Sequence, residues 1–151
     1  MARGKTVLAT GVFDILHPGH LRFLQESRKR GGPGARLVVV IARDKTVRKR
    51  KGRNPVLPET QRRQIVAFLK PVYKAILGRE EDVRKASFFL GIIQTVKPDI
   101  LCVGYDQNDI KRFVKRIIAR EKLPVRLVQL PKFGLPGLNS STGIKRRVLN
   151  S

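Results

Sequence analysis

Short apolar runs alternate with amphipathic stretches along this chain, and that alternation limits the folds it can adopt. The run Leu37–Ile41 is continuous and rich in β-branched residues, which is typical of a strand covered on both faces. Strands that alternate with helices pair in parallel through right-handed crossovers. The pattern therefore predicts an α/β fold with a five-stranded parallel sheet and helices on both faces. The expected strands are Val7–Thr10, Leu37–Ile41, Val72–Leu77, Ile100–Val103 and Val125–Leu130.

The stretches between these runs favour helices. We expect Leu21 and Leu24 on one face of the first, and Ile65, Val66 and Leu69 on the inner side of another. No break is long enough to divide the chain, so residues 1–151 are expected to form a single domain. The basic segment Lys45–Asn54 contains a glycine and is predicted as a loop. The predicted helices are Leu21–Arg30, one from Pro58, Glu80 to about Val96, Asp109–Lys122, and a short basic one from Ser140–Thr142 to the end.

The formal net charge of +22 is the extreme feature of the composition and indicates anionic partners or substrates. Nucleic-acid binding is one explanation, and polyphosphate substrates on a surface adapted to heat are another. Few aromatic residues are present, which argues against base stacking on single strands. The single cysteine, Cys102, excludes a disulfide within the chain. No apolar run is long enough to span a membrane, so a cytoplasmic protein is expected.

Both histidines lie in the segment Gly11–His20, between a predicted strand and a predicted helix. A strand, a tight turn and a helix start present backbone N–H groups to a phosphate. Pro18 suits the first helical turn, and Gly19 allows close approach to the backbone. Imidazoles here can donate hydrogen bonds to an α-phosphate as charge builds on it. His-x-x-His alone is more often a helix-starting turn, but the preceding Gly-x-Phe-Asp favours a nucleotide site.

Other polar segments are predicted at the same edge of the sheet, beyond the carboxyl ends of the strands. Ser140–Thr142 with Lys145 is either a phosphate-binding helix tip or an ordinary N-cap. Lys49–Arg53 with Arg62 and Arg63 could neutralise a triphosphate, although each alone is more often a solvated charge. Asp106 could accept from a ribose hydroxyl or a base amine, or it could cap the next helix. The segments at this edge are Gly11–His20, Arg43–Asp44, Gly78–Arg79, Gly104–Asp106 and Phe133–Thr142.

Several common signatures are missing. The chain has no Walker lysine loop, no Gly-x-Gly-x-x-Gly and no Gly-x-Ser-x-Gly. A zinc site could draw only on His17, His20, Cys102 and carboxylates, which is a weak set, so no protein-bound metal is predicted.

Two segments together carry a resemblance to the cytidylyltransferase-like nucleotidyltransferases, which are marked by His-x-Gly-His. They are Gly11–His20 and Asn139–Lys145. Further patterns resemble the archaeal FAD synthetases within that superfamily, among them Lys51-Gly52-Arg53, Gln61-Arg62-Arg63 and Gly104-Tyr105-Asp106-Gln107. The resemblance implies a Rossmann-like nucleotidyltransferase fold. It implies catalytic roles for His17, His20, Lys51 and Arg62, and nucleotide contacts from Val12, Phe13, His17, Pro18, Gly19, His20, Asp106, Phe133, Ser141 and Thr142.

The same resemblance implies transfer of AMP from ATP to FMN, which gives FAD and pyrophosphate with a divalent ion, Mg²⁺. It also implies a homodimer. No membrane partner is expected, because no apolar run is long enough to span a membrane. A cytidylyltransferase acting on a phosphorylated alcohol such as glycerol phosphate is the nearest alternative. A basic module that binds nucleic acid without catalysis is the alternative from another class.

Overall fold

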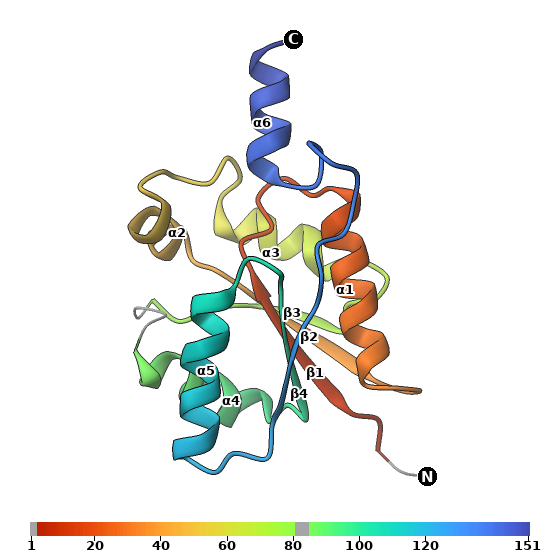
Figure 1. Cartoon of the computed structure of the whole chain (residues 1–151), viewed down its shortest axis with the longest axis vertical. Coiled ribbons are helices and arrows are strands. Elements are labelled where there is room, and N and C mark those ends of the chain that lie inside the picture. Colours follow the sequence, from red (N-terminus) through yellow and green to blue (C-terminus); the bar gives the residue numbers. More distant parts are fainter. Residues whose placement is uncertain (1–2, 81–84) are drawn as a thin grey trace.

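The parallel sheet predicted from the sequence is confirmed in the computed structural model, which describes residues 3–80 and 85–151. All its strand pairs are parallel, and the strand order is β3-β2-β1-β4-β5. Figure 1 shows the sheet between two layers of helices. The elements in chain order are β1 (Thr6–Gly11), α1 (Pro18–Arg30), β2 (Arg36–Ile41), α2 (Asp44–Lys51), α3 (Glu59–Ala67), β3 (Lys74–Leu77), α4 (Ala86–Val96), β4 (Ile100–Val103), α5 (Asn108–Arg120), β5 (Arg126–Gln129) and α6 (Ser141–Leu149).

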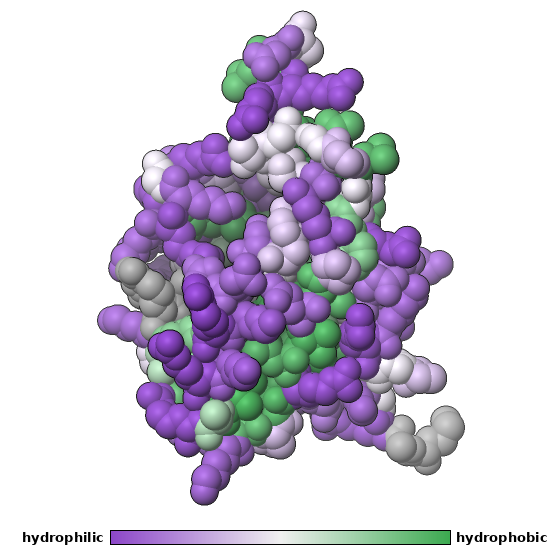
Figure 2. Space-filling view, in the orientation of Figure 1, coloured by the Kyte–Doolittle hydropathy of each residue, from purple (hydrophilic) through white to green (hydrophobic). Residues whose placement is uncertain are grey.

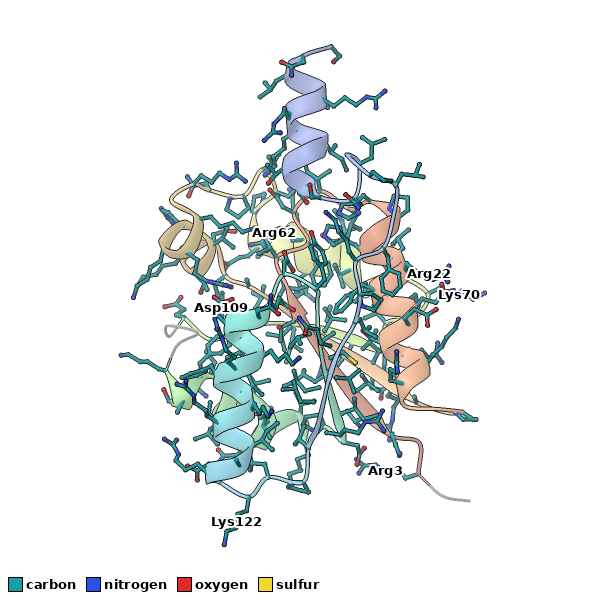
Figure 3. All side chains as sticks on the ribbon, in the orientation of Figure 1. Arg3, Arg22, Arg62, Lys70, Asp109 and Lys122 are labelled. Carbon is teal, nitrogen blue, oxygen red and sulfur yellow. The ribbon has the colours of Figure 1, made fainter. Side chains whose placement is uncertain are left out.

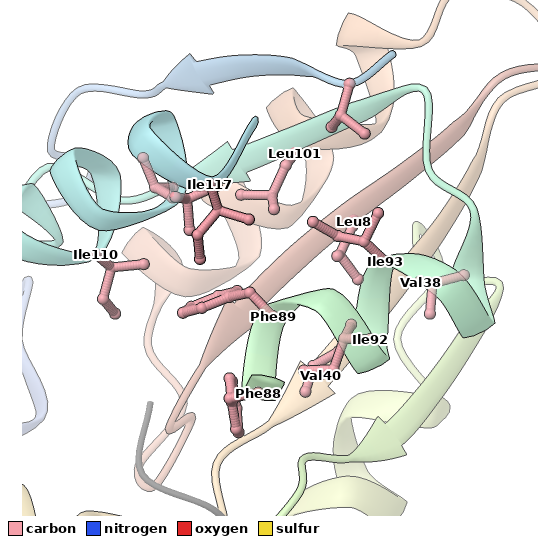
Figure 4. Close-up of a cluster of buried hydrophobic side chains, with 13 residues drawn as sticks. Leu8, Val38, Val40, Phe88, Phe89, Ile92, Ile93, Leu101, Ile110 and Ile117 are labelled. Atoms are coloured by element: carbon pink, nitrogen blue, oxygen red, sulfur yellow. The ribbon is translucent and has the colours of Figure 1, made fainter. Parts of the chain in front are cut away.

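Successive strand residues point to opposite faces, so the sheet separates two apolar cores. On one face Leu8 and Leu101 pack against Phe89 of α4 and Ile117 of α5 (Figure 4). On the other face neighbouring strand residues pack with Leu24 of α1 and Val66 of α3. This arrangement explains why the strands are continuously apolar rather than alternating.

The segment predicted as a loop at Lys45–Asn54 is instead mostly helix α2, so that prediction was wrong. Thr46 and Val47 of α2 are buried and give the helix an inner face. Its first N–H, on Asp44, donates to a Glu59 carboxylate oxygen at 2.6 Å. Gly52 ends the helix in the left-handed conformation (φ 69°), where a residue without a side chain fits best. The density of charged residues concealed these helix-forming features.

Smaller differences concern helix faces and ends. Ile65, expected on the inner side of its helix, is 41% exposed, and Leu21, expected on the same face as Leu24, is 42% exposed, whereas Leu24 and Val66 are fully buried. Helix α4 begins at Ala86, and the predicted helix start at Glu80–Asp82 lies mainly outside the described residues.

The strand order reverses next to β1, because β2 pairs on one side of it and β4 on the other. Ligands of open α/β sheets bind beyond the carboxyl ends of the strands at this reversal. Helix α6 projects from the same end of the molecule (Figure 1) and has no buried residue.

Candidate active site

A cavity of about 280 Å³ lies beyond the carboxyl ends of β1 and β4. It brings together the histidine turn and the hydroxyl-rich tip of α6, although these segments are more than 120 residues apart in the chain. Of the residues that the resemblance assigns to the site, these line it: Val12, Phe13, His17, Gly19, His20, Lys51, Asp106, Phe133, Ser141 and Thr142. Arg62 and Pro18 are not among the lining residues.

The histidine turn is built by the start of α1. His17 is the N-cap residue in an extended conformation, and Pro18 follows at the first helical position, where no N–H is needed. The His17 carbonyl accepts from the N–H groups of His20 and Leu21 at 3.0 and 3.3 Å. The two imidazoles stack, with 3.8 Å between ring centroids. The turn therefore fixes both rings against each other at the cavity wall.

The surroundings of the two imidazoles lower the pKa of both rings. Burial, the neighbouring His17 and the Lys51 ammonium lower the pKa of His20 to about 4. Burial and Lys132 also lower the pKa of His17. The Nδ1 atoms of both rings are buried, and neither has a hydrogen-bond partner in the described part of the chain. Buried polar atoms without partners are costly, so holding this ring pair at the cavity wall lowers stability.

The lowered pKa of His20 makes stability depend on pH. Between pH 6.5 and about 4 the unfolded chain binds the His20 proton more readily than the folded chain does. We therefore expect the free energy of unfolding to fall by about 3 kcal/mol as the pH drops through this window. Urea denaturation at pH 7.5, 5.5 and 4.5 measures the change. His20→Asn should flatten the pH dependence, and an unchanged slope in that variant would contradict the prediction.

Two glycines allow close packing around the histidines. A Cβ on Gly19 would lie 2.6 Å from the Phe133 carbonyl oxygen and 2.8 Å from the His17 ring. A Cβ on Gly11 would lie 2.6 Å from the ring of Phe13, which has a left-handed backbone (φ 53°). The Phe13 ring in turn lies 5.4 Å from the His20 ring. Gly11 and Gly19 therefore let a backbone loop and an aromatic ring reach the imidazole pair.

Gly19→Ala is expected to lower the catalytic activity of this site while the chain still folds. The new methyl group collides with the Phe133 carbonyl, which is backbone and cannot rotate away, so the 131–134 loop must shift at the cavity wall. A misplacement of about 1 Å can cost on the order of 10²-fold in rate. Steady-state assays of Gly19→Ala beside Gln25→Ala, an exposed change on the same helix, measure the effect. Equal rates in the two variants would show that this contact is unimportant.

Asp14 ties three segments of the site together, a role that the sequence reading missed. Its carboxylate accepts from the N–H groups of Val56 and Leu57 at 2.8 and 2.9 Å and from the Lys145 ammonium at 2.7 Å. Burial alone would raise the pKa of Asp14, but these bonds outweigh burial and lower it. The sequence feature that could have indicated this role is the position of Asp14 directly after Gly11-Val12-Phe13.

The tip of α6 is fixed by further bonds to the loops of the site. Ser140 caps the helix by accepting from the Gly143 N–H at 3.0 Å. Ser141 donates to the Ile15 carbonyl at 3.1 Å, and Arg53 donates to the Thr142 hydroxyl at 3.0 Å. The first turn of α6 thus brings hydroxyl and N–H groups to the cavity that the histidines also line.

Arg62, which the resemblance places at the phosphates, lies instead inside the protein (Figure 3). Its side chain is fully buried and donates to the carbonyls of Leu57, Val12 and Ala42 at 2.7–2.9 Å. It also pairs with the Asp44 carboxylate at 2.6 Å. With its guanidinium occupied by these acceptors, Arg62 acts as a positioning residue for the loops after β1 and β2. These contacts favour a positioning role over the direct role expected for Arg62. Pro18 is also absent from the residues that line the cavity, and its side chain is exposed to solvent.

Lys51 and Asp106 face the cavity from α2 and from the loop after β4. Burial and Arg53 lower the pKa of Lys51, and Asp106 opposes that change. Gln107 holds the loop of Asp106, because it accepts from the Gly104 N–H at 2.7 Å and donates to the Thr10 carbonyl at 3.3 Å. These contacts place a cation and a carboxylate on the same cavity.

The donor set fits a magnesium ion carried by a nucleotide better than one held by the protein. Within residues 3–80 and 85–151, no three His, Cys, Asp or Glu side chains lie close enough to hold a metal. Asp14 and Asp106 are the carboxylates lining the cavity, and Asp14 is already engaged. Magnesium commonly binds one or two carboxylates together with substrate phosphates. Asp106 is the side chain that could contribute to such binding.

Fold and site together define a nucleotidyltransferase, and comparison with known proteins agrees. Residues 8–147 match the cytidylyltransferase-like family. The chain belongs to this family, and the resemblance inferred from its two motifs is confirmed. No helix in the described part of the chain is long and apolar enough to cross a membrane.

The chain is similar over nearly its whole length to archaeal FAD synthases. It is 45% identical to the FAD synthase of Methanopyrus kandleri, covering 97% of this chain and 93% of the relative. The FAD synthase of Methanothermobacter thermautotrophicus is 44% identical, covering 95% and 91%. A crystal structure of a Thermoplasma volcanium protein described as a lipopolysaccharide core biosynthesis protein has a TM-score of 0.75 and 40% identity, covering 87% of this chain and 99% of that one. A Francisella tularensis pantoate–β-alanine ligase, at 17% identity and a TM-score of 0.66 over 95% of this chain and 65% of that one, shares the fold.

Proposed function

We propose that this protein is an FAD synthase that transfers AMP from ATP to FMN and releases pyrophosphate. One observation carries the proposal: the stacked histidines and the hydroxyl-rich tip of α6 line one cavity. The similarity to archaeal FAD synthases supports the choice of substrates. A site with an anion-binding group at each end suits a triphosphate that is cleaved between its α and β phosphates.

The reaction needs no protein nucleophile. A phosphate oxygen of FMN attacks the α-phosphorus of ATP, a P–O bond forms, and the bond to the β-phosphate oxygen breaks. Catalysis then depends on alignment and on stabilising the charge that develops. His17 and His20 donate to oxygens on the α-phosphate, and Lys51 neutralises adjacent charge. Ser141, Thr142 and the N–H groups of α6 hold the departing pyrophosphate, while Val12, Phe13, Gly19, Asp106 and Phe133 contact the nucleotide.

The experiment that tests the proposal separates nucleotide from acceptor. Purified protein is incubated with Mg²⁺ and FMN plus either ATP or CTP, and the products are resolved by chromatography. FAD and pyrophosphate in equal amounts from ATP are expected. CTP turnover with a phosphorylated alcohol such as glycerol phosphate, with no flavin product, would replace the proposal with a cytidylyltransferase.

We also propose that the protein is a homodimer and that Mg²⁺ is required as the ATP complex. Val148 and Leu149 near the end of α6 are 67% and 85% exposed, which leaves apolar surface for a partner copy. Sedimentation analysis should give twice the 17.1 kDa chain mass, and a monomer at micromolar concentration would contradict the first proposal. Chelation by EDTA should stop FAD formation, and excess Mg²⁺ should restore it.

A further inference from the structure

Helices α2 and α5 both carry exposed basic residues beside the cavity. The outward side of α5 carries Arg112, Lys115 and Arg116, all exposed. Arg50, near the end of α2, lies 3.8 Å from the carboxylate of Asp109 at the start of α5, so the two helices meet there. We call this surface the α2–α5 strip and define it by Lys45, Arg48, Arg50, Arg112, Lys115, Arg116 and Lys122.

The strip is visible as a region of the molecule. Figure 1 places α2 above α5 on the left of the view, and in Figure 2 most of the coloured surface in that region is hydrophilic. Figure 3 labels Asp109 and Lys122 near the two ends of α5, with Lys70 on the opposite side of the molecule. The two acidic residues at the ends of α5 already have basic partners. Asp109 in its first turn pairs with Arg50, and Glu121 just after its end pairs with Arg120. The exposed side of the helix between them is therefore strongly positive.

Heat adaptation does not account for this charge. Ion-pair networks need both signs, but the chain has 33 Lys and Arg against 11 Asp and Glu. One-to-one pairing would leave 22 cations without a carboxylate, and such an excess repels itself. The excess positive charge of the chain therefore lowers stability unless anions offset it.

Attraction of the nucleotide substrates accounts for the end of the strip at the cavity, where Arg50 is a lining residue, but not for its whole length. Ile110 lines the cavity, and Arg116, the last strip residue on α5, lies six residues further along the helix, roughly 9 Å at the helical rise per residue. The Debye length at physiological ionic strength is about 8 Å. Charges at the far end of α5 are thus screened from a nucleotide in the cavity.

The chemistry of the strip favours phosphodiester backbones over membranes or unpaired bases. Among the described residues, none of the large exposed hydrophobic side chains belongs to α2 or α5. A membrane-bound helix needs an apolar face for the lipid, whereas Ile110, Val114 and Ile117 of α5 are buried in the protein core. Single-strand binding uses exposed aromatic platforms, which the strip also lacks.

We propose that the α2–α5 strip binds the phosphate backbone of double-stranded nucleic acid without reading its bases. Lysine and arginine on the outward face of α5, spaced three and four residues apart, contact successive phosphates. Association releases condensed counterions, so affinity depends steeply on salt. This function is additional to the chemistry in the cavity, and it does not depend on which substrate the cavity takes.

The test measures binding of labelled 20-base-pair RNA and DNA duplexes of one sequence by fluorescence anisotropy, across a range of KCl concentrations. The strip variant combines Arg112→Gln, Lys115→Gln and Arg116→Gln. A matched control combines Lys29→Gln, Arg30→Gln and Lys70→Gln, which remove the same charge from exposed positions elsewhere. Loss of three phosphate contacts should weaken binding about 10²-fold at 0.15 M salt and reduce the slope of log affinity against log salt by about 3.

Each outcome decides the proposal. Backbone recognition is supported if both duplexes bind with similar affinity and this affinity is lost in the strip variant but kept in the control. A preference for RNA or DNA identifies which of the two supplies the phosphates. Equal losses of duplex affinity in the strip variant and the control would show that binding depends on net charge alone, and would overturn the proposal for the strip. Binding to phosphatidylserine vesicles without binding to either duplex would overturn it in favour of a membrane surface. FAD formation should be unchanged in the strip variant, because its substituted residues do not line the cavity.

Discussion

Replacing His17 by alanine is expected to lower kcat for FAD formation about 10²–10³-fold, the usual cost of losing one donor to a transition state. His17 is 7% exposed, and its ring stacks on His20 at the wall of the cavity. The loss should fall on kcat more than on KM, because the donor acts most strongly as charge develops on the α-phosphate. Initial rates with saturating ATP and FMN measure it.

The control for this variant is structural. Circular dichroism and the midpoint of thermal unfolding should show that His17→Ala remains folded, since its N-cap role uses only the backbone. Gln94→Ala, an exposed change on α4, provides the reference for a substitution far from the cavity. FAD formation at the wild-type rate in His17→Ala would remove His17 from the mechanism.

The second large effect is expected from Arg62→Met, which should lower the free energy of unfolding by about 3–5 kcal/mol. Arg62 is fully buried and pairs with Asp44, so its removal leaves that carboxylate without its partner. Three carbonyl oxygens also lose their donor. Chemical denaturation at neutral pH measures the loss.

A more conservative variant separates positioning from direct contact with substrate. Arg62→Lys keeps the charge but cannot reproduce the planar guanidinium that reaches several acceptors. We expect it to lower stability with a smaller effect on KM for ATP. A variant as stable as wild type but with a greatly raised KM for ATP would instead place Arg62 at the phosphates.

The sequence was sufficient for the fold class because its signals are local. Continuous β-branched runs such as Leu37–Ile41 mark doubly covered strands, and the strand–turn–helix segment around His17 shows where a phosphate would bind. Helix α2 was missed because eight residues dominated by lysine and arginine give a weak apolar pattern. Thr46 and Val47 form its buried face only when the sheet is present to cover them.

Pairing over long sequence separations explains what was missed in the site. Arg62 occurs in a basic sequence and looks like a surface charge, yet its partners Val12 and Ala42 are 50 and 20 residues away. The contact between Asp14 and Lys145 spans 131 residues. Such pairs depend on how loops meet above the sheet, and no periodicity in a single chain encodes them.

The absence of buried residues in α6 has a consequence for ligand binding. The bonds described for this helix involve its first turns, and several of them reach loops that line the cavity. Binding of a nucleotide in the cavity and docking of helix α6, the C-terminal arm, against the cavity loops are therefore linked equilibria, and each favours the other. Nucleotide should protect the arm from trypsin, whose cleavage sites include Arg146 and Arg147, and removing the arm should weaken nucleotide binding by the same factor.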